Sequence, residues 1–225
     1  MGSVFGKESV AEPAFQVLLE RTTAHVQTTY ELRRYGERFA AEAFYAKDDD
    51  DNSPFRLLAS YIGVFGNPQN EGEEAIAMTA PVMMSRNSAS AVAIDMTAPV
   101  VKSAKQGQKI MEFVLPAKYD ALSKIPKPTN PNVHIKEIPS QVGAVHRFSG
   151  SYDDSRSEKI ALELAEQLRK DGIDIKDADV ARNYQFWGYN PPFCLPAFRR
   201  NEVWIELTTE QADQLVKDFN PAEIN

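Results

Sequence analysis

The sequence contains a single cysteine, Cys194, among its 225 residues. One thiol cannot form an intramolecular disulfide, so small secreted proteins built on disulfide bridges are excluded and a reducing compartment is indicated. No apolar run approaches the length of a transmembrane helix. The N-terminus carries Glu8 and Glu12 and lacks a basic stretch followed by an apolar one, so no secretory signal or clear plastid transit peptide is apparent. We expect a cytoplasmic protein, with plastid association left open.

The chain also has little positive charge. It contains 25 Lys and Arg against 32 Asp and Glu, a net charge of -7, and it shows no basic stripe. Proteins that hold a phosphate backbone need such a stripe, so nucleic acid is not an expected partner. The three histidines are scattered, and HExxH, paired-cysteine, P-loop, GxGxxG and GxSxG motifs are absent from the sequence. We therefore predict no catalytic residues, no dedicated metal site and no enzymatic activity.

Apolar residues make up 43% of the chain, which is enough for the core of one ordinary domain. In the first half, alternation predicts a strand near Phe15 and a strand pair within Thr28 to Ala46 that turns at Gly36. Ser53 and Pro54 predict the start of a short amphipathic helix, and Gly63 its end. The apolar residues of that helix are Phe55, Leu58, Ala59 and Ile62. A strand follows at Lys109 to Pro116.

The second half repeats this order. Residues 133–150 predict strand, turn and strand, and a capping box of Ser155 and Glu158 predicts a second helix that Gly172 ends. Further strands are predicted at Ala181–Tyr189 and Asn201–Leu207, and a C-terminal helix at residues 208–219. The order β-β-α-β-β, found twice, predicts an α+β domain: an antiparallel sheet curled around a core, with two helices on its surface.

The pentapeptide MTAPV occurs twice, at Met78–Val82 and at Met96–Val100. Its proline cannot donate to a ladder, so each copy is expected at a sheet edge or at a bulge. Two interpretations remain open at this point. The second copy is either a tandem duplication that lengthens a hairpin or a segment with a chemical role of its own.

Several segments in order resemble the SOUL, or heme-binding protein, family. They are AIAMTAPV, YDALSKIPKPTNPNVHIKEIP, FSGSYD and GYNPPFCLPAFRRNEVWIEL. The resemblance covers residues 17–207 and leaves an N-terminal extension, 1–16, and a C-terminal helix or tail, 208–225. The opening MGSVFGK and the doubled MTAPV resemble the plant and algal cytosolic branch. One MTAPV copy would then be the family strand and the other an insertion.

This resemblance implies a fold and a function. The implied fold is a distorted antiparallel β-barrel of two β-α-β-β-like halves with two flanking helices, similar to bacterial effector-binding domains. The implied function is reversible binding of heme or a related tetrapyrrole in a surface groove beside the first helix, as a carrier or buffer. The alternative is an interaction or sensor module that binds another hydrophobic ligand or a protein partner. An enzyme that uses acidic residues in the groove is a third option. The oligomeric state and the ligand's identity stay open.

A porphyrin is a flat apolar disc with two propionates, so its groove needs apolar walls and cations at the rim. The first helix offers Phe55, Leu58, Ala59 and Ile62, although these residues also fit core packing. The late loop offers Phe193 and Leu195, and its Cys194 is a candidate thiolate ligand. The candidate cations are Arg56, Arg199 and Arg200. The first helix carries only Arg56, whereas family members can carry more basic residues there.

The remaining candidates for binding iron are histidines and methionines. His25 and His134 are expected to be exposed, and His146 is expected on an apolar strand face, where packing explains it. Met78 and Met96 carry thioethers that could ligate iron, but methionine in a β-rich core usually fills space. We therefore expect iron to be bound without a strong axial ligand from the protein.

Overall fold

The computed structural model describes residues 10–23, 25–46, 51–86, 108–151, 153–190 and 194–219. The strands are β1 (Phe15–Arg21), β2 (Tyr30–Tyr35), β3 (Arg38–Tyr45), β4 (Val82–Arg86), β5 (Lys109–Val114), β6 (His134–Ile138), β7 (Gln141–Phe148), β8 (Gln185–Gly188) and β9 (Asn201–Leu207). The α-helices are α1 (Asn52–Ile62), α2 (Asp154–Lys170), α3 (Asp177–Asn183) and α4 (Thr209–Phe219). Two 3-10 turns, η1 (Leu122–Lys124) and η2 (Pro196–Phe198), complete the order.

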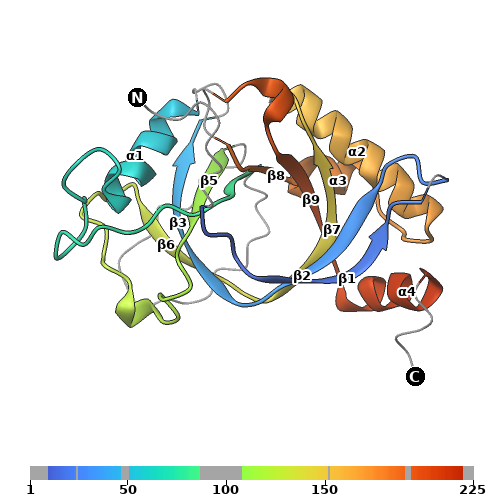
Figure 1. Ribbon diagram of the computed structural model, residues 1–225, viewed down its shortest axis with the longest axis horizontal. Coiled ribbons are helices and arrows are strands. Elements are labelled where there is room, and N and C mark those ends of the chain that lie inside the picture. Colours follow the sequence, from blue (N-terminus) through green and yellow to red (C-terminus); the bar gives the residue numbers. More distant parts are fainter. Residues whose placement is uncertain are drawn as a thin grey trace.

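The predicted repeat is present. The order β2-β3-α1-β4-β5 is followed by β6-β7-α2-β8-β9, with the short α3 inserted before β8. β1 precedes the first repeat, and α4 follows the second as the predicted C-terminal helix (Figure 1). The described chain therefore has four α-helices where the sequence predicted three. α3 covers residues 181–183, which were predicted to begin a strand.

One antiparallel sheet contains all nine described strands, in the order β1-β2-β7-β9-β8-β4-β5-β3-β6. The order is symmetric about the β4–β8 pair. Moving outward from this pair, β9 corresponds to β5, β7 to β3 and β2 to β6, and each pair has one strand from each repeat. β1 and β6 are the two edges, so within the described strands the sheet is open. The sheet predicted to form a distorted barrel is therefore not closed in this part of the chain.

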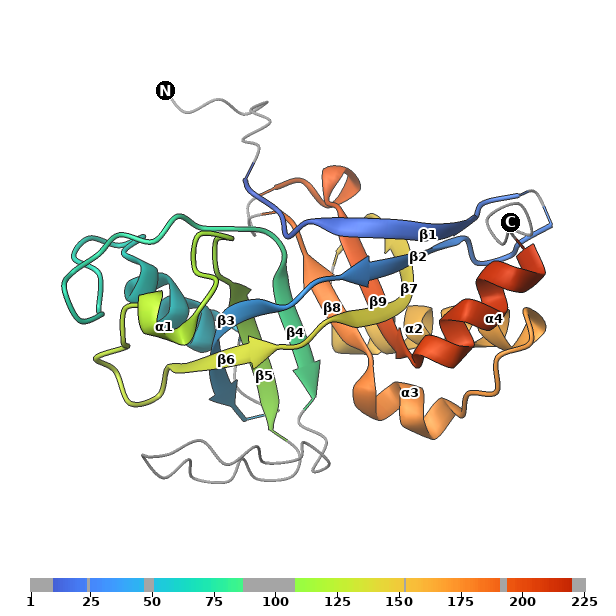
Figure 2. The same ribbon diagram turned by 90° about the horizontal axis from the view of Figure 1, so that it is seen from below.

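The two predicted hairpins are instead one long two-stranded ribbon. β2 continues into β3, and β6 into β7, across the middle of the molecule (Figure 2). β2 pairs with β7 and β3 with β6, and the register is unbroken: Tyr35 lies opposite Gln141, and Arg38 lies opposite Ile138. Pro139 falls in the gap between the two ladders, where its missing N–H removes no ladder bond. The sequence pattern identified the strands correctly but not their partners.

Both predicted helices form, with different starts. α1 begins at Asn52 with Asp51 at its N-cap, two residues before the predicted cap Ser53, and Gly63 ends it in the left-handed region at φ 90°. α2 is capped by Asp153, whose side chain accepts from the N–H of Arg156. The capping box predicted from Ser155 and Glu158 is therefore wrong, because the helix starts earlier.

The first MTAPV copy leads into β4, which lies between β5 and β8 in the interior of the sheet. The expectation of a sheet edge or a bulge is wrong for this copy: the proline, Pro81, stands immediately before the strand, so its missing N–H falls outside the ladder. The hydroxyl of Thr79 donates to the carbonyl of Val114, and the N–H of Ala80 donates to Ala11 O at 3.0 Å. The second copy, Met96–Val100, lies outside the described residues.

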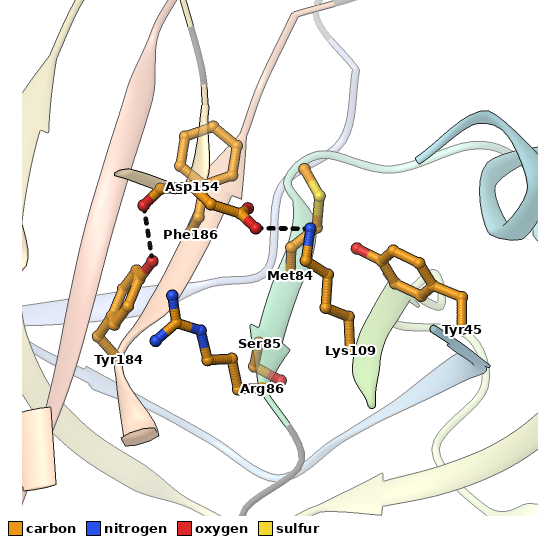
Figure 3. Close-up of a pocket in the computed structure, with 8 residues that line it drawn as sticks. All are labelled: Tyr45, Met84, Ser85, Arg86, Lys109, Asp154, Tyr184 and Phe186. Atoms are coloured by element: carbon orange, nitrogen blue, oxygen red, sulfur yellow. Dashed lines mark hydrogen bonds and ion pairs between the residues drawn. The ribbon is translucent and has the colours of Figure 1, made fainter. Parts of the chain in front are cut away.

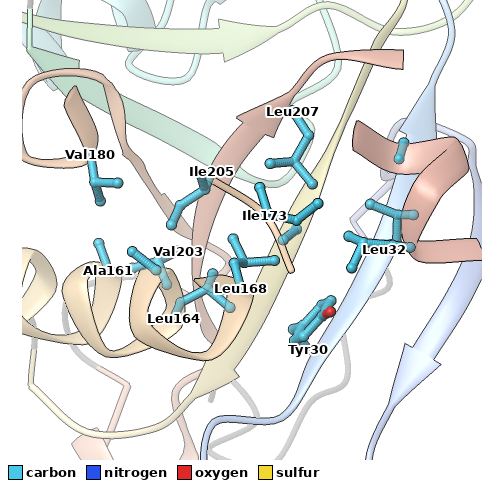
Figure 4. Close-up of a cluster of buried hydrophobic side chains, with 14 of the residues drawn as sticks. Tyr30, Leu32, Ala161, Leu164, Leu168, Ile173, Val180, Val203, Ile205 and Leu207 are labelled. Carbon is cyan, nitrogen blue, oxygen red and sulfur yellow. The ribbon is translucent and has the colours of Figure 1, made fainter. Parts of the chain in front are cut away.

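Three buried clusters show how the layers pack. α2, α3 and α4 pack on β2, β7 and β9, and the cluster between them includes Leu32, Leu164, Leu168 and Ile205 (Figure 4). α1 packs on β3 and β5 through a second cluster. The third cluster lies on the opposite face of the strands, where Trp187 and Trp204 stack with ring centroids 5.1 Å apart. Between α1 and α2, the β4–β8 pair, here called the central seam, is left without a covering helix.

Candidate functional site

A groove with a volume of about 420 Å³ lies over the central seam. Its floor comes from β4, β5, β8 and β9, and α1 forms one wall. The described lining residues are Asp51, Asn52, Phe55, Arg56, Phe65, Val82, Met84, Met111, Phe186, Gly188, Asn190, Arg199 and Asn201. The groove exists because α1 covers only β3 and β5, which leaves the outer face of the central seam open to solvent.

Aromatic rings and thioethers dominate the groove's apolar surface. Phe55 of α1 is half-buried and packs edge-on against Phe113, with centroids 5.4 Å apart. Phe65, just after α1, is 62% exposed, which is unusual for a phenylalanine without a ligand or partner. Met84 and Phe186 line the floor from β4 and β8. Flat apolar molecules fit such a surface, because aromatic faces stack and thioethers adapt to irregular contacts.

Two arginines give the groove a cationic side. Arg56 projects from α1 and is exposed, and no ion pair is found for it within the described residues. Arg199 is half-buried and follows η2, where its Nε donates to Cys194 O at 2.9 Å. The guanidinium groups reach the groove from two elements far apart in sequence. They are the cations that an anionic ligand edge would meet first.

The predicted site residues divide between groove, core and surface. Phe55, Arg56 and Arg199 line the groove. Leu58, Ala59 and Ile62 are 0%, 0% and 3% exposed and belong to the cluster beneath α1, so they pack in the core and not in the groove wall. Leu195 is 63% exposed and does not line the groove. Phe193 lies outside the described residues.

Arg200 and Cys194 are also placed away from the groove lining. Arg200 donates to both carboxylate oxygens of Glu12, at 2.8 and 3.0 Å, and its Nε donates to Glu202 Oε1 at 3.0 Å. Glu202 is fully buried and also receives Arg33 Nη1 at 2.9 Å and the hydroxyl of Tyr189 at 2.7 Å. Arg200 is therefore part of a buried ion network. Cys194 is half-buried, with its sulfur 3.7 Å from Leu195 O.

None of the three histidines lines the groove in the described chain. His25 is exposed. The expectation that His134 is exposed is wrong: it is half-buried against the Phe44 ring, and burial lowers its pKa. His146 is half-buried on β7, with Nδ1 2.6 Å from Thr29 O. Met78 packs against the cluster beneath α1. Among the described residues, no three His, Cys, Asp or Glu side chains are grouped to hold a metal ion.

A small cavity of about 20 Å³, here called the alcove, adjoins the groove (Figure 3). Its lining residues are Tyr45, Met84, Ser85, Arg86, Lys109, Asp154, Tyr184 and Phe186. Met84 and Phe186 line both spaces and form the boundary between them. Lys109 Nζ lies 2.7 Å from Asp154 Oδ2 and 3.9 Å from Asp51 Oδ1, so the N-terminal ends of α1 and α2 meet at this lysine.

The sequence pattern of SOUL heme-binding proteins matches residues 10–90 and residues 83–206. Together the two matches span both repeats and every described residue that lines the groove. The chain belongs to the SOUL heme-binding protein family. The SOUL resemblance predicted from the sequence segments is thus confirmed at the level of the family. No curated protein matches the sequence of this SOUL chain.

Solved structures share the fold of this SOUL domain. The C-terminal domain of EcmrR is 13% identical, with a TM-score of 0.50, and the similarity covers 81% of this chain and 98% of that one. A hydrolase from Listeria innocua is 8% identical, with a TM-score of 0.51, and the similarity covers 82% of this chain and 94% of that one. At these identities the likeness concerns fold alone. No helix of the described chain is long and apolar enough to cross a membrane.

Proposed function

We propose that this SOUL protein binds heme or a related tetrapyrrole reversibly in the groove over the central seam. The observation that carries the proposal is the chemistry of the groove: three phenylalanines and two methionines form an apolar surface, and two arginines stand beside it. A volume of about 420 Å³ lies in the range of small-molecule sites. The family description points to the same ligand class.

The residues present fit a flat disc with acidic substituents. Phe55, Phe65 and Phe186 offer ring faces and edges to the macrocycle, and Arg56 and Arg199 offer donors to its propionates. The described groove lining contains neither histidine nor cysteine, which supports iron held without a strong axial ligand. Bound heme would supply its own redox and ligand-binding chemistry. The protein's part would be to bind, orient and shield the ligand.

The role we propose is that of a non-enzymatic carrier or buffer in the cytoplasm, with a small molecule and not nucleic acid as its partner. The single thiol fits a reducing compartment. The groove is open to solvent along the central seam, which suits exchange of the ligand more than permanent retention. The doubled MTAPV and the opening MGSVFGK support a place in the plant and algal branch of the family.

A spectroscopic titration tests this function. The purified protein is titrated with hemin and with protoporphyrin IX, following the Soret band and the fluorescence of Trp187 and Trp204, the chain's only tryptophans. We expect saturable binding at one ligand per chain and quenching of the tryptophans, because Trp187 lies in β8 beside the groove residues Phe186 and Gly188. Binding that does not saturate, for either ligand, would reject the proposal.

The rival function is an interaction module. It is favoured by η2 and its flank, where Leu195 and Phe198 are 63% and 72% exposed outside the groove. Large exposed apolar side chains often mark protein contacts. The titration separates the two functions, because a module that has lost its ligand would show no saturable change in either signal.

A further inference from the structure

The turn at η2 carries the two most exposed large apolar side chains of the described chain. Phe198 is 72% exposed and Leu195 is 63% exposed, and neither belongs to one of the three buried clusters. Pro196 and Ala197 between them are also exposed, so the four residues form a continuous apolar tip. Residues three apart in a 3-10 turn lie on the same side. Leu195 and Phe198 therefore project together, and core packing does not account for them.

The base of this turn is held by backbone hydrogen bonds. The N–H of Phe198 donates to Leu195 O at 2.9 Å, and the N–H of Arg199 donates to Pro196 O at 3.1 Å. The N–H of Gly150 also donates to Pro196 O, at 2.8 Å, which ties the turn to the segment between β7 and α2. An apolar tip on a fixed base is preorganised for a partner, because it loses little conformational freedom on binding.

Arginines surround the apolar tip. Arg199 and Arg200 follow it directly in sequence, and Arg147 is exposed near the end of β7. The guanidinium of Arg156 lies against Gly150, where an added Cβ would meet its Nη1 at 2.5 Å. Both Nη atoms of Arg156 donate to backbone carbonyls, which carry no net charge and do not neutralise it.

Carboxylates offset only part of this positive charge. Glu12 and the fully buried Glu202 pair with Arg200, and Asp153 caps α2 beside Arg156. Within this group of side chains the cations outnumber the carboxylates, in a chain whose net charge is -7. The surroundings of the turn are therefore suited to an anionic partner, unlike the chain as a whole.

The size of the tip favours a lipid surface over a protein as that partner. A stable protein interface buries about 800 Å² on each side, whereas one phenylalanine buries about 150–250 Å². A tip of four residues cannot supply such an interface. A bilayer needs no matching shape, because apolar side chains enter the boundary between headgroups and acyl chains while arginines bind the phosphates.

We propose that η2 docks the protein reversibly on an anionic phospholipid surface. Leu195 and Phe198 enter the boundary of the acyl chains, and the surrounding arginines contact the lipid phosphates. Arg199 follows the turn and lines the groove, so docking brings the cationic side of the groove to the bilayer, where apolar ligands dissolve. This inference goes beyond the proposed function and does not depend on it, since docking requires no bound ligand.

Vesicle flotation of the ligand-free protein tests the proposal. Wild type should bind vesicles of phosphatidylcholine mixed with phosphatidylserine, and should bind phosphatidylcholine alone more weakly. Raising the salt from about 0.1 M to about 1 M shortens the Debye length from about 10 Å to about 3 Å and should weaken binding several-fold. Phe198→Asp should reduce binding to the mixed vesicles at least about 10-fold, with an unchanged thermal midpoint, because the side chain faces solvent.

Leu122→Asp is the matched control. Leu122 is 40% exposed on η1, a second 3-10 turn, which Figure 1 shows at the lower left, away from η2 at the top. Both variants add one negative charge to the chain, so only the location differs. Leu122→Asp should bind the mixed vesicles within about 2-fold of wild type.

Three results would overturn the docking proposal: wild type that binds neither kind of vesicle, equal binding to both kinds, or equal binding by Phe198→Asp and Leu122→Asp. Sedimentation velocity adds a fourth. If wild type is an oligomer that Phe198→Asp turns into a monomer, the turn is a contact between copies of the chain and not a lipid anchor. The hemin titration contains no lipid, so it judges the groove function separately.

Discussion

Three arginines predicted for one cationic rim have different surroundings in the structure. Arg56 and Arg199 line the groove, whereas Arg200 is held by Glu12 and the fully buried Glu202. A buried carboxylate without its cations would cost several kcal/mol, so Arg200 is committed to the fold. Arg199 and Arg200 are neighbours in the segment between η2 and β9, yet one lines the groove and the other belongs to the ion network.

Another buried carboxylate leads to a prediction of how the stability of the fold depends on pH. Glu42 of β3 lies opposite Glu112 of β5, with Lys136 Nζ 3.8 Å away. Burial raises the pKa of Glu42 to about 7; Lys136 opposes this shift and Glu112 adds to it. In the unfolded chain a glutamate has a pKa of about 4.3. The folded state thus holds the proton more tightly, and stability is lost as pH rises from the unfolded to the folded value.

Replacing Glu42 by Gln removes this loss. The free energy of unfolding of Glu42→Gln should exceed that of wild type at pH 8 by about 1–3 kcal/mol, with the difference shrinking toward pH 4. Urea unfolding at pH values from 4 to 8 measures the difference. Parallel pH curves for the two proteins would contradict the assignment.

At the scale of elements, α1 serves the core with one face and the groove with another. The spacing of Phe55, Leu58, Ala59 and Ile62 predicted the helix but could not divide these residues between the two faces. Leu58 and Ala59 are fully buried, and Phe55 and Arg56 face the groove. The division depends on which strands the helix covers and which strands it leaves open, and that is a tertiary property.

Leu58→Ala tests this division. Truncating a fully buried leucine should lower the free energy of unfolding by about 2–5 kcal/mol. Under conditions where the variant is folded, its hemin affinity should stay within about 2-fold of wild type, since the side chain does not line the groove. Urea unfolding and the Soret titration supply the two numbers. A large loss of affinity in a folded variant would place Leu58 in the site.

The strands show where sequence reasoning ends. Alternation and turn residues located β2, β3, β6 and β7, because these signals are local. Whether two neighbouring strands form a hairpin or one bent strand depends on the partner, and the partner lies about a hundred residues away. The unbroken register from Tyr35–Gln141 to Arg38–Ile138 therefore could not be predicted from either segment alone.

At the scale of the molecule, the two repeats create the groove by what they leave uncovered. α1 covers β3 and β5, α2 packs on β2, β7 and β9, and β4 and β8 meet between the two helices. The resemblance predicted Phe55, Arg56 and Arg199 because they lie on the expected helix and loop. It missed Phe65, Met84 and Phe186, because the floor is assembled from strands that meet only in the folded sheet. The first MTAPV copy leads into one of these strands, β4.

The central claim is that a tetrapyrrole binds over this seam, and a pair of charge substitutions tests it most directly. Phe65 and Phe198 are 62% and 72% exposed, but only Phe65 lines the groove. Neither Phe65→Asp nor Phe198→Asp should unfold the domain, because both side chains already face solvent. In hemin titrations Phe65→Asp should bind at least about 10-fold more weakly than wild type, through lost apolar contact and a charge against the macrocycle. Phe198→Asp should bind as wild type does; equal affinities for the two variants, or a loss confined to Phe198→Asp, would contradict the account.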